Sequence, residues 1–248
     1  MSQVESLPLL LKQLGLSSML DQWELLQEQA INGQWSHGAY LAKLAELEAN
    51  TRYQKRIARH IKESKLPPGK SLAQFDFNLT PSINQQQVIA LADNISWVRE
   101  ANNCVIFGPS GVGKTHIACA IAYRLIELGL RCQFYSTTAL VQKLQHARLE
   151  YRLPELLARL GKIPLLILDD IGYVKKDQLE TSVLFDLIAD RYESSSIIIT
   201  ANQPFSEWDN IFPDSMMAVA AIDRIIHHAS IINIKGESFR KTHSSIKH

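Results

Sequence analysis

The sequence lacks an excess of charge of either sign, a long apolar run and a cysteine-rich framework. Its 248 residues carry 26 lysines and arginines against 25 aspartates and glutamates, so a net charge of +1 by itself indicates no particular partner. No apolar run approaches the roughly 18–20 residues that span a bilayer, and the N-terminus lacks the pattern of a signal peptide. We therefore expect a cytoplasmic protein without membrane contact.

Only three cysteines are present, and none has the spacing of metal ligands. Cys104 and Cys132 lie in apolar strand-like segments and Cys119 in an apolar helical segment, so buried, reduced thiols are expected. The chain also has no internal repeat and no low-complexity tract. Its length accommodates one α/β core and a small accessory domain, because single domains commonly have about 100–200 residues.

The first 70 residues favour a small helical domain. Apolar residues such as Leu10 and Leu14 recur there at helical spacing, without strand-like alternation. Gly15, the Asn32-Gly33 pair and the prolines at 67 and 68 interrupt the helices. These signals place a domain boundary near residues 66–75, which divides the chain into residues 1–70 and 71–248.

Residues 71–248 alternate between helices and strongly apolar strands. The predicted strands are residues 103–107, 132–136, 165–168, 196–200 and 230–234, and the predicted helices are 81–100, 114–128, 138–150, 179–192 and 218–228. Strands this apolar have no solvated face. The pattern predicts an α/β fold, a parallel sheet flanked by helices on both sides.

A phosphate-binding loop (P-loop) connects the first predicted strand of this core to the next helix. It reads Gly108-Pro109-Ser110-Gly111-Val112-Gly113-Lys114-Thr115. Its glycines let consecutive backbone N–H groups surround phosphate oxygens at the N-terminus of the helix. Lys114 is expected to reach the β- and γ-phosphates, and the Thr115 hydroxyl to bind Mg²⁺. The strand–loop–helix context therefore predicts a site for ATP and Mg²⁺.

Polar residues end two further predicted strands. Asp169 and Asp170 follow four aliphatic residues, at the sheet edge where ligands bind in open α/β folds. Asp169 is the candidate on the Mg²⁺ side, and Asp170 the candidate that orients or deprotonates the attacking water; a turn cap is the alternative for Asp170. Asn202 is a candidate γ-phosphate sensor, with Thr200 a weaker choice; turn geometry before Pro204 would also explain Asn202.

These motifs together resemble AAA+ ATPases, and most closely the IstB-like helper ATPases of insertion sequences, relatives of the DnaC helicase loader. The resemblance covers essentially the whole chain and includes residues 71–77, 169–173, 222–224 and 236–240. It implies a P-loop NTPase of the AAA+ type with a small N-terminal helical domain. It further implies an ATPase that assembles as a homo-oligomer on double-stranded target DNA and regulates a cognate transposase.

The resemblance also assigns residues outside the P-loop. Arg224 corresponds to the arginine that completes a neighbouring subunit's site, and Arg240 to a position that reaches the nucleotide from the C-terminal side. Phe75 and Phe77 lie where AAA+ proteins often frame adenine, although they are equally suited to anchoring the linker. Arg191 is a second interface candidate, with a solvated helix charge as the alternative.

Residues 51–70 are rich in basic side chains and almost without acid. On a helix, Tyr53, Ile57 and Ile61 would form one apolar stripe. The remaining circumference would present five cations to DNA phosphates: Arg52, Lys55, Arg56, Arg59 and Lys62. An ordinary solvated helix surface is the alternative.

Two other functions use the same nucleotide site. A DnaC-like helicase loader shares the ATPase motifs. A metabolite kinase shares the P-loop, but Asp170 with Asn202 is an arrangement for positioning water.

Overall fold

The computed structural model describes residues 3–172, 178–210, 215–236 and 238. The chain divides into two compact units, Met1–Arg59 and His60–His248. The first unit is helical, as predicted, with α1 (Gln3–Gln13), α2 (Ser17–Asn32) and most of α3 (His37–Ser64). Its small core is centred on four buried side chains: Leu11, Trp23, Leu26 and Leu44.

A buried carboxylate, Glu48, ties α2 to α3. Its Oε2 accepts hydrogen bonds from the backbone N–H groups of Ser18 (2.8 Å) and Met19 (3.2 Å), which have no partner within the first turn of α2. Its Oε1 accepts from Arg52 Nε at 2.7 Å. Burial alone would raise the pKa of Glu48, but the hydrogen bonds from Arg52 and from these two N–H groups lower it below its usual value.

The division between the units lies inside α3, earlier than the boundary near residue 70 that the prolines indicated. His60 and Ser64 are buried. The Tyr123 hydroxyl lies 3.4 Å from the Leu66 carbonyl oxygen and 3.2 Å from that of Pro67, so the segment after α3 packs on the second unit. Because α3 continues across the division, the boundary between the two units does not coincide with the end of a helix.

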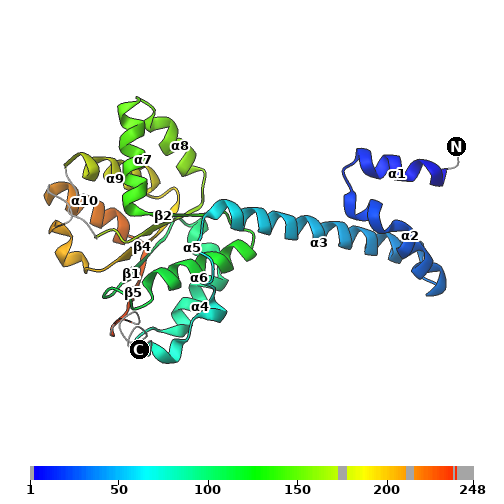
Figure 1. Cartoon of the computed structure of the whole chain (residues 1–248), viewed down its shortest axis with the longest axis horizontal. Helices are drawn as coiled ribbons and strands as arrows, with labels where there is room; N and C mark the ends of the chain where they lie inside the picture. Colours follow the sequence, from blue (N-terminus) through cyan, green and yellow to red (C-terminus); the bar gives the residue numbers. More distant parts are fainter. Residues whose placement is uncertain (1–2, 173–177, 211–214, 237, 239–248) are drawn as a thin grey trace, which may run out of the picture. The chain divides into compact units, whose positions relative to one another are not determined.

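The second unit contains a five-stranded parallel sheet, which confirms the predicted fold class (Figure 1). Its strands are β1 (Asn103–Phe107), β2 (Cys132–Ser136), β3 (Leu165–Asp169), β4 (Ser196–Ala201) and β5 (Ala229–Asn233). They lie in the order β2-β3-β4-β1-β5, and all neighbouring pairs are parallel. Strand β4 therefore lies between β1, which leads into the P-loop, and β3, which ends in the carboxylates.

Helices cover both faces of this sheet, with α4 and α6 on one side and α7 to α10 on the other (Figure 1). They are α4 (Gln85–Asp93), α5 (Ser96–Arg99), α6 (Lys114–Glu127), α7 (Thr137–Leu149), α8 (Leu153–Gly161), α9 (Gln178–Arg191) and α10 (Ser215–Ile226). Three short 3-10 helices complete the unit: η1 (Leu72–Gln74), η2 (Phe77–Leu79) and η3 (Phe205–Asn210).

One helix prediction was wrong, and one helix was missed. The single helix expected over residues 81–100 is broken at Asn94, whose side chain accepts a hydrogen bond from the Ser96 N–H at 2.8 Å and so starts α5. Trp97 then folds back, and its Nε1 donates to the Leu91 carbonyl at 2.9 Å. Helix α8 was not predicted, because it is short and has a proline in its first turn.

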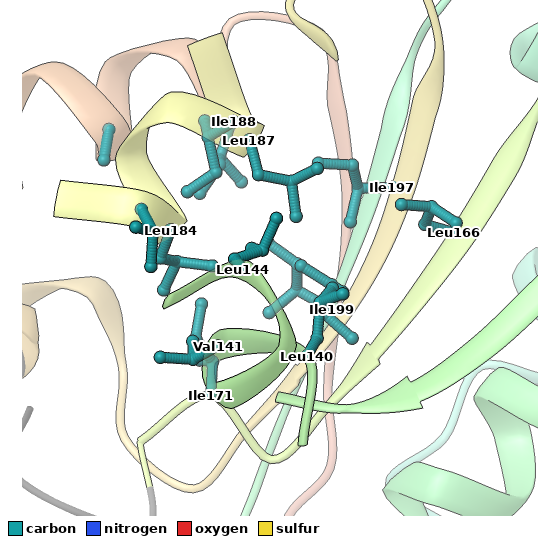
Figure 2. Close-up of a cluster of buried hydrophobic side chains, with 14 of the residues drawn as sticks. Leu140, Val141, Leu144, Leu166, Ile171, Leu184, Leu187, Ile188, Ile197 and Ile199 are labelled. Atoms are coloured by element: carbon teal, nitrogen blue, oxygen red, sulfur yellow. The ribbon is translucent and has the colours of Figure 1, made fainter. Parts of the chain in front are cut away.

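The alternation of side chains along each strand assigns residues to the two layers. Leu166, Ile197 and Ile199 face α7 and α9, where they pack against residues such as Leu144 and Leu184 (Figure 2). The residues that alternate with these along each strand point to the other face of the sheet, toward α6. Asp169 on β3 and Thr200 on β4 are among these residues, so both side chains lie on the face of the sheet that α6 covers.

All three cysteines are buried and unpaired, as expected. Burial raises the pKa of the Cys104 and Cys119 thiols to about 12, so neither forms a thiolate at neutral pH. Within the described ranges, no helix combines the length and the apolar character needed to cross a membrane.

Candidate nucleotide-binding site

The P-loop connects β1 to α6 and lies at the carboxyl edge of the sheet. Gly113 caps the N-terminus of α6 with a left-handed backbone (φ 100°). A residue with a side chain would be destabilising in this conformation. A Cβ at Gly113 would lie 2.9 Å from Phe75 Cε2, and one at Gly111 would clash with Ser238 Oγ. These contacts leave no room for a side chain at Gly111 or Gly113, so the loop exposes its backbone at these two positions.

The phosphate pocket is a cavity of about 290 Å³ beside this loop. It is bordered by P-loop residues, including Lys114 and Thr115, and by Lys70, Asp169, Asp170 and Asn202. The structure thus brings together residues of the P-loop and of the ends of β3 and β4, all predicted from sequence. Lys70 was not predicted, because its position next to the loop depends on how the linker folds.

Lys114 is buried, and its ammonium group lies over the P-loop. Its Nζ donates to the carbonyl oxygens of Gly108 and Pro109, both at 2.8 Å, and to Asn202 Oδ1 at 2.6 Å. The ammonium group is therefore held against the P-loop, at the border of the pocket. To contact a phosphate it needs only to exchange one or more of these acceptors for phosphate oxygens.

Asn202 joins Lys114 to Asp170. Its Oδ1 accepts from Lys114, and its Nδ2 donates to Asp170 Oδ1 at 2.8 Å. The amide has only this orientation available, because an ammonium group is solely a donor and a carboxylate solely an acceptor. The hydrogen bonds form a chain from the P-loop lysine to the candidate water-activating carboxylate.

Asp169 belongs to a second hydrogen-bonded group. Its Oδ1 accepts from the hydroxyls of Thr115 (2.8 Å) and Thr200 (2.7 Å). Thr200 Oγ1 also accepts from the Asp170 N–H at 2.8 Å. The Thr200 hydroxyl, the weaker sensor candidate, is thus occupied in holding the two carboxylate residues, and Asn202 is the polar side chain of this strand end that borders Lys114.

Asp170 has a left-handed backbone, with φ of 64°. Asp and Asn tolerate this conformation better than other residues with side chains. The conformation turns the chain immediately after β3, so the consecutive carboxylates diverge: Asp169 contacts Thr115, and Asp170 contacts Asn202. Neighbouring residues of one sequence motif therefore belong to different parts of the site.

The oxygen donors at Thr115 and Asp169 fit a magnesium ion. Mg²⁺ is usually bound by one or two carboxylates together with phosphates and water, not by a cage of protein ligands. The described residues contain no cluster of three or more His, Cys, Asp or Glu side chains that would bind a different metal. One carboxylate and one hydroxyl 2.8 Å apart, beside a phosphate pocket, match this preference.

The two phenylalanines expected to frame the base occupy different positions. Phe75 packs edge-on against His116 (ring centroids 5.1 Å apart) and against Phe77 (4.9 Å). It borders a pocket next to Gly111 and Gly113. Both rings border a groove along α4 and α6. Phe75 also borders the pocket next to the P-loop, so it has the position nearer the loop.

Arg224 lies on α10, away from the phosphate pocket of its own chain. Its guanidinium carbon is 4.9 Å from the centre of the Phe185 ring. Its Nη1 is buried and has no hydrogen-bond partner among the described residues. Arg240, the other arginine assigned by resemblance, lies outside the described residues.

The alternatives for Arg191 were both wrong, because it is neither solvated nor at an interface. Its side chain is 1% exposed. The guanidinium donates to the carbonyl oxygens of Leu160 (2.9 Å), Ile163 (3.0 Å) and Ser196 (2.7 Å). Burial lowers its pKa to about 10. Arg191 therefore joins the end of α9 to the turn after α8 and to the start of β4.

We expect Arg191→Ala to lower the free energy of unfolding by about 3–5 kcal/mol, because it removes the hydrogen bonds to the carbonyls of Leu160, Ile163 and Ser196 together with a fully buried side chain. Urea denaturation of the purified protein measures this. Arg148→Ala is the matched control, since Arg148 is exposed and its ion pair with Asp186 is long, at 3.5 Å; the expected loss there is below about 1 kcal/mol. Equal losses in the two variants would contradict the structural role of Arg191.

The five basic residues predicted to face DNA are all exposed on α3: Arg52, Lys55, Arg56, Arg59 and Lys62. Arg52 differs from the others, because it pairs with Glu48 and also donates to the Gly15 carbonyl at 2.9 Å. The predicted apolar stripe was correct only at Ile57. Tyr53 and Ile61 are more than a third exposed, and His60 and Ser64 are buried with Ile57 instead.

The family model of IstB-like ATP binding proteins matches residues 9–247. An insertion-sequence ATP-binding protein of Sinorhizobium fredii is 48% identical over 95% of this chain and 79% of its own length. The ATP-binding protein of insertion sequence IS21 from Pseudomonas aeruginosa is 37% identical over 96% of this chain and 89% of its own.

Solved structures share the fold of the second unit. The DnaI structure has a TM-score of 0.56 at 23% identity, over 66% of this chain and 90% of that one. AMPPCP-bound DnaA from Aquifex aeolicus has a TM-score of 0.56 at 18% identity, over 68% and 51%. At such identities these likenesses show the fold alone, a parallel sheet flanked by helices. The family match and the relatives cover nearly the whole sequence, and the chain therefore belongs to the family of IstB-like ATP binding proteins.

Proposed function

We propose that this protein is an ATP-hydrolysing, DNA-binding AAA+ helper of DNA transposition, which assembles on target DNA in the cytoplasm and regulates a partner transposase. The observation that carries the enzymatic part is the chain of hydrogen bonds from Lys114 through Asn202 to Asp170, beside the pair of Thr115 and Asp169. It surrounds a pocket of about 290 Å³ that the P-loop borders. The relatives' names, which describe ATP-binding proteins of insertion sequences, support the biological context.

In the proposed reaction the P-loop and Lys114 bind the triphosphate. Backbone N–H groups at the start of α6 and the Lys114 ammonium group supply the positive charge. Thr115 and Asp169 hold Mg²⁺, which when bound neutralises negative charge on the phosphate oxygens. Ligand binding replaces the contacts that Lys114 makes with the loop carbonyls in this structure.

Asp170 and Asn202 position the water that attacks the γ-phosphate. Asp170 accepts the proton or orients the water, and hydrolysis needs chiefly such alignment, because the protein makes no covalent bond. Asn202 contacts both Lys114 and Asp170. A γ-phosphate that attracts Lys114 therefore also changes the hydrogen bonding of the residue that holds the water-activating carboxylate.

Assembly brings Arg224 of one subunit to the nucleotide of the next. A guanidinium supplied in this way stabilises charge on the transferring phosphoryl group only in the oligomer. Helix α10 has the surface expected for such an interface, since Met216 is 81% and Val219 is 64% exposed, one to two turns before Arg224. Turnover thereby depends on contact between subunits.

We assign the binding of the transposase and of DNA to the helical first unit. Its surface includes exposed large apolar side chains, among them Leu14, Ile31 and Leu41, as expected where a protein partner docks. Arg56 and Arg59 are exposed on α3, and the Arg56 guanidinium lies 5.2 Å from the centre of the Tyr53 ring. Cations of this kind contact phosphates with little sequence preference. The insertion-sequence relatives favour transposition over helicase loading.

Phosphate release from ATP, measured with Mg²⁺ and without any small acceptor, tests the proposed activity. A DNA-dependent helper hydrolyses ATP to ADP and phosphate, and duplex DNA increases the rate. Turnover that required an added small-molecule acceptor would instead identify a metabolite kinase. Absence of hydrolysis with and without DNA would contradict the proposed activity.

The double variant Arg56→Ala/Arg59→Ala should weaken duplex binding and reduce its salt dependence. Loss of two phosphate contacts lowers the slope of log affinity against log salt concentration by about 1.8. Fluorescence anisotropy with labelled duplex at several salt concentrations measures the slope. Lys43→Ala is the matched control on the same helix, because Lys43 is paired with Glu46 at 2.9 Å. An unchanged slope in the double variant would place the DNA site elsewhere.

Arg52 is not part of this test. Its loss would remove the partner of buried Glu48 and disturb the start of α2, so a change in DNA binding would have two explanations.

A further inference from the structure

The linker that follows α3 is fastened at two points to α6, the helix that begins at the P-loop. The Tyr123 hydroxyl donates to the Pro67 carbonyl at 3.2 Å. Further along the linker, His116 Nε2 lies 3.0 Å from the Ser71 carbonyl oxygen, so Nε2 carries the proton and donates. His116 is in the first turn of α6 and borders the phosphate pocket. Residues 67–71 are therefore held beside this pocket.

The backbone of this linker has little freedom immediately before Lys70. Pro67 and Pro68 each have a φ that the proline ring fixes, and Gly69 has a left-handed backbone with φ of 73°. The backbone of Lys70 therefore has a defined position between the two hydrogen bonds to α6. A ligand that contacts its side chain does not have to order this part of the backbone, which would otherwise cost conformational entropy.

Lys70 and Lys114 both border the phosphate pocket, but their ammonium groups differ in their contacts. Lys114 Nζ donates to two loop carbonyls and to Asn202. Lys70 is partly buried and makes no hydrogen bond or ion pair with any residue in the described ranges. An ammonium group is solely a donor, and its charge is attracted to an anion that enters the pocket. Lys70 is thus available to a ligand without first giving up a protein acceptor.

The surroundings of Cys119 show which part of the pocket Lys70 borders. Cys119 lies one turn after Thr115 on α6. Burial raises the pKa of its thiol, the positive charge of Lys70 opposes this increase, and the negative charge of Asp169 adds to it. Lys70 and Asp169 are therefore both near this residue. Lys70 borders the part of the pocket next to Thr115 and Asp169, whereas Lys114 contacts Asn202 at the end of β4.

We propose that Lys70 binds phosphate oxygens of the nucleotide, so that the linker after α3 is part of the nucleotide site. The proposal rests on the proposed function, because it takes a triphosphate to lie in the phosphate pocket. A triphosphate carries more negative charge than the Lys114 ammonium group neutralises, and Lys70 supplies a second cation from a different segment of the chain. Bound nucleotide thereby connects the P-loop to residues 67–71 and restrains them.

Lys70→Met tests this proposal, because methionine keeps much of the aliphatic stem and removes the charge. The affinities for ATP and for inorganic tripolyphosphate should both fall about tenfold to a hundredfold, the effect of one hydrogen bond to a charged group. Tripolyphosphate has no base or ribose, so an equal loss identifies a phosphate contact. Calorimetric titration of the full chain with each probe in the presence of Mg²⁺ measures both affinities.

Lys162→Met is the matched control. Lys162 is exposed in the turn after α8 and does not border the phosphate pocket. The substitution removes the same charge from the protein, and we expect wild-type affinity for both probes. Lys70→Arg keeps a cation at the linker and should recover most of the affinity that Lys70→Met loses.

Hydrogen exchange provides a readout that distinguishes a phosphate contact from a structural role. Saturating ATP should slow exchange of the backbone amides of residues 69–75 in the wild-type protein and much less in Lys70→Met. The melting temperature of nucleotide-free Lys70→Met should equal that of the wild type. A lower melting temperature, with no recovery of affinity in Lys70→Arg, would assign Lys70 to folding and overturn the proposal.

Three binding results would also overturn the proposal while leaving the proposed function intact. They are wild-type affinity for both probes in Lys70→Met, a loss of ATP affinity without a loss for tripolyphosphate, and an equal loss in Lys162→Met. Failure of the wild-type protein to bind either probe would count against the proposed function itself and, with it, against this proposal.

Discussion

Replacement of Lys114 by alanine should lower the affinity for ATP about a hundredfold and abolish measurable hydrolysis. Hydrogen bonds to charged groups each contribute about 1.5–3 kcal/mol, and Lys114 is expected to contact two phosphates. Its Nζ lies 2.8 Å from the Gly108 and Pro109 carbonyls and 2.6 Å from Asn202 Oδ1. It therefore already borders the pocket before nucleotide binds.

Lys114→Met is the companion variant. Methionine retains much of the buried aliphatic stem and removes the ammonium group, so it separates lost charge from lost packing. Both variants should bind nucleotide equally poorly, with melting temperatures that show a folded protein. Near-wild-type ATP affinity in a folded Lys114→Met protein would exclude the P-loop lysine from phosphate binding.

Asp170→Asn should slow hydrolysis by roughly a hundredfold to ten-thousandfold, the usual contribution of a general base, while ATP binding and ATP-dependent assembly persist. Asparagine is the appropriate substitution, because residue 170 has a φ of 64°. Asn tolerates this left-handed backbone, whereas alanine would add strain of about 1–2 kcal/mol. Single-turnover phosphate release measures the chemical step directly. A wild-type rate in Asp170→Asn would remove Asp170 from the mechanism.

Arg224→Ala should also reduce turnover, by about a thousandfold or more if the arginine acts on a neighbouring subunit. Mixing the two inactive variants then distinguishes a role in trans from a role in cis. A subunit with Arg224→Ala retains Asp170, and an adjacent Asp170→Asn subunit supplies the missing arginine. Random mixing in equal amounts creates such a complete site at about one position in four.

Recovery of phosphate release on mixing is therefore expected. Each variant alone, at the same total concentration, is the control. Absence of recovery, in a mixture shown by sedimentation to form joint oligomers, would contradict the assignment of Arg224 to the neighbouring site.

The sequence predicted the sheet closely, and it also predicted that the P-loop and the ends of β3 and β4 lie together. The bounds of β1 and β2 agree with the structure, and those of β3, β4 and β5 differ by one residue. Buried parallel strands are short apolar runs, so composition marks them clearly. The P-loop and the ends of β3 and β4 meet at one edge because parallel strands all end there, and this follows from topology without knowledge of side-chain contacts.

The remaining features depend on contacts between residues far apart in the sequence. In the sequence, Arg191 resembles an ordinary charged residue of a helix. Only the folded chain places its guanidinium against the carbonyls of the turn after α8. Lys70 is an isolated lysine in a linker, and only the folded chain brings it to the phosphate pocket. The pairing of Arg52 with Glu48 could be noted as an i,i+4 pair, but its attachment to the start of α2 has no local signal.

A γ-phosphate bound at the P-loop is expected to drive subunits together on DNA. Sedimentation velocity of the wild-type protein with duplex DNA and Mg²⁺, under ADP and under a non-hydrolysable ATP analogue, measures this coupling. We predict a large complex with the analogue and much smaller species with ADP. The same distribution of sizes under both nucleotides would show that the γ-phosphate does not control assembly.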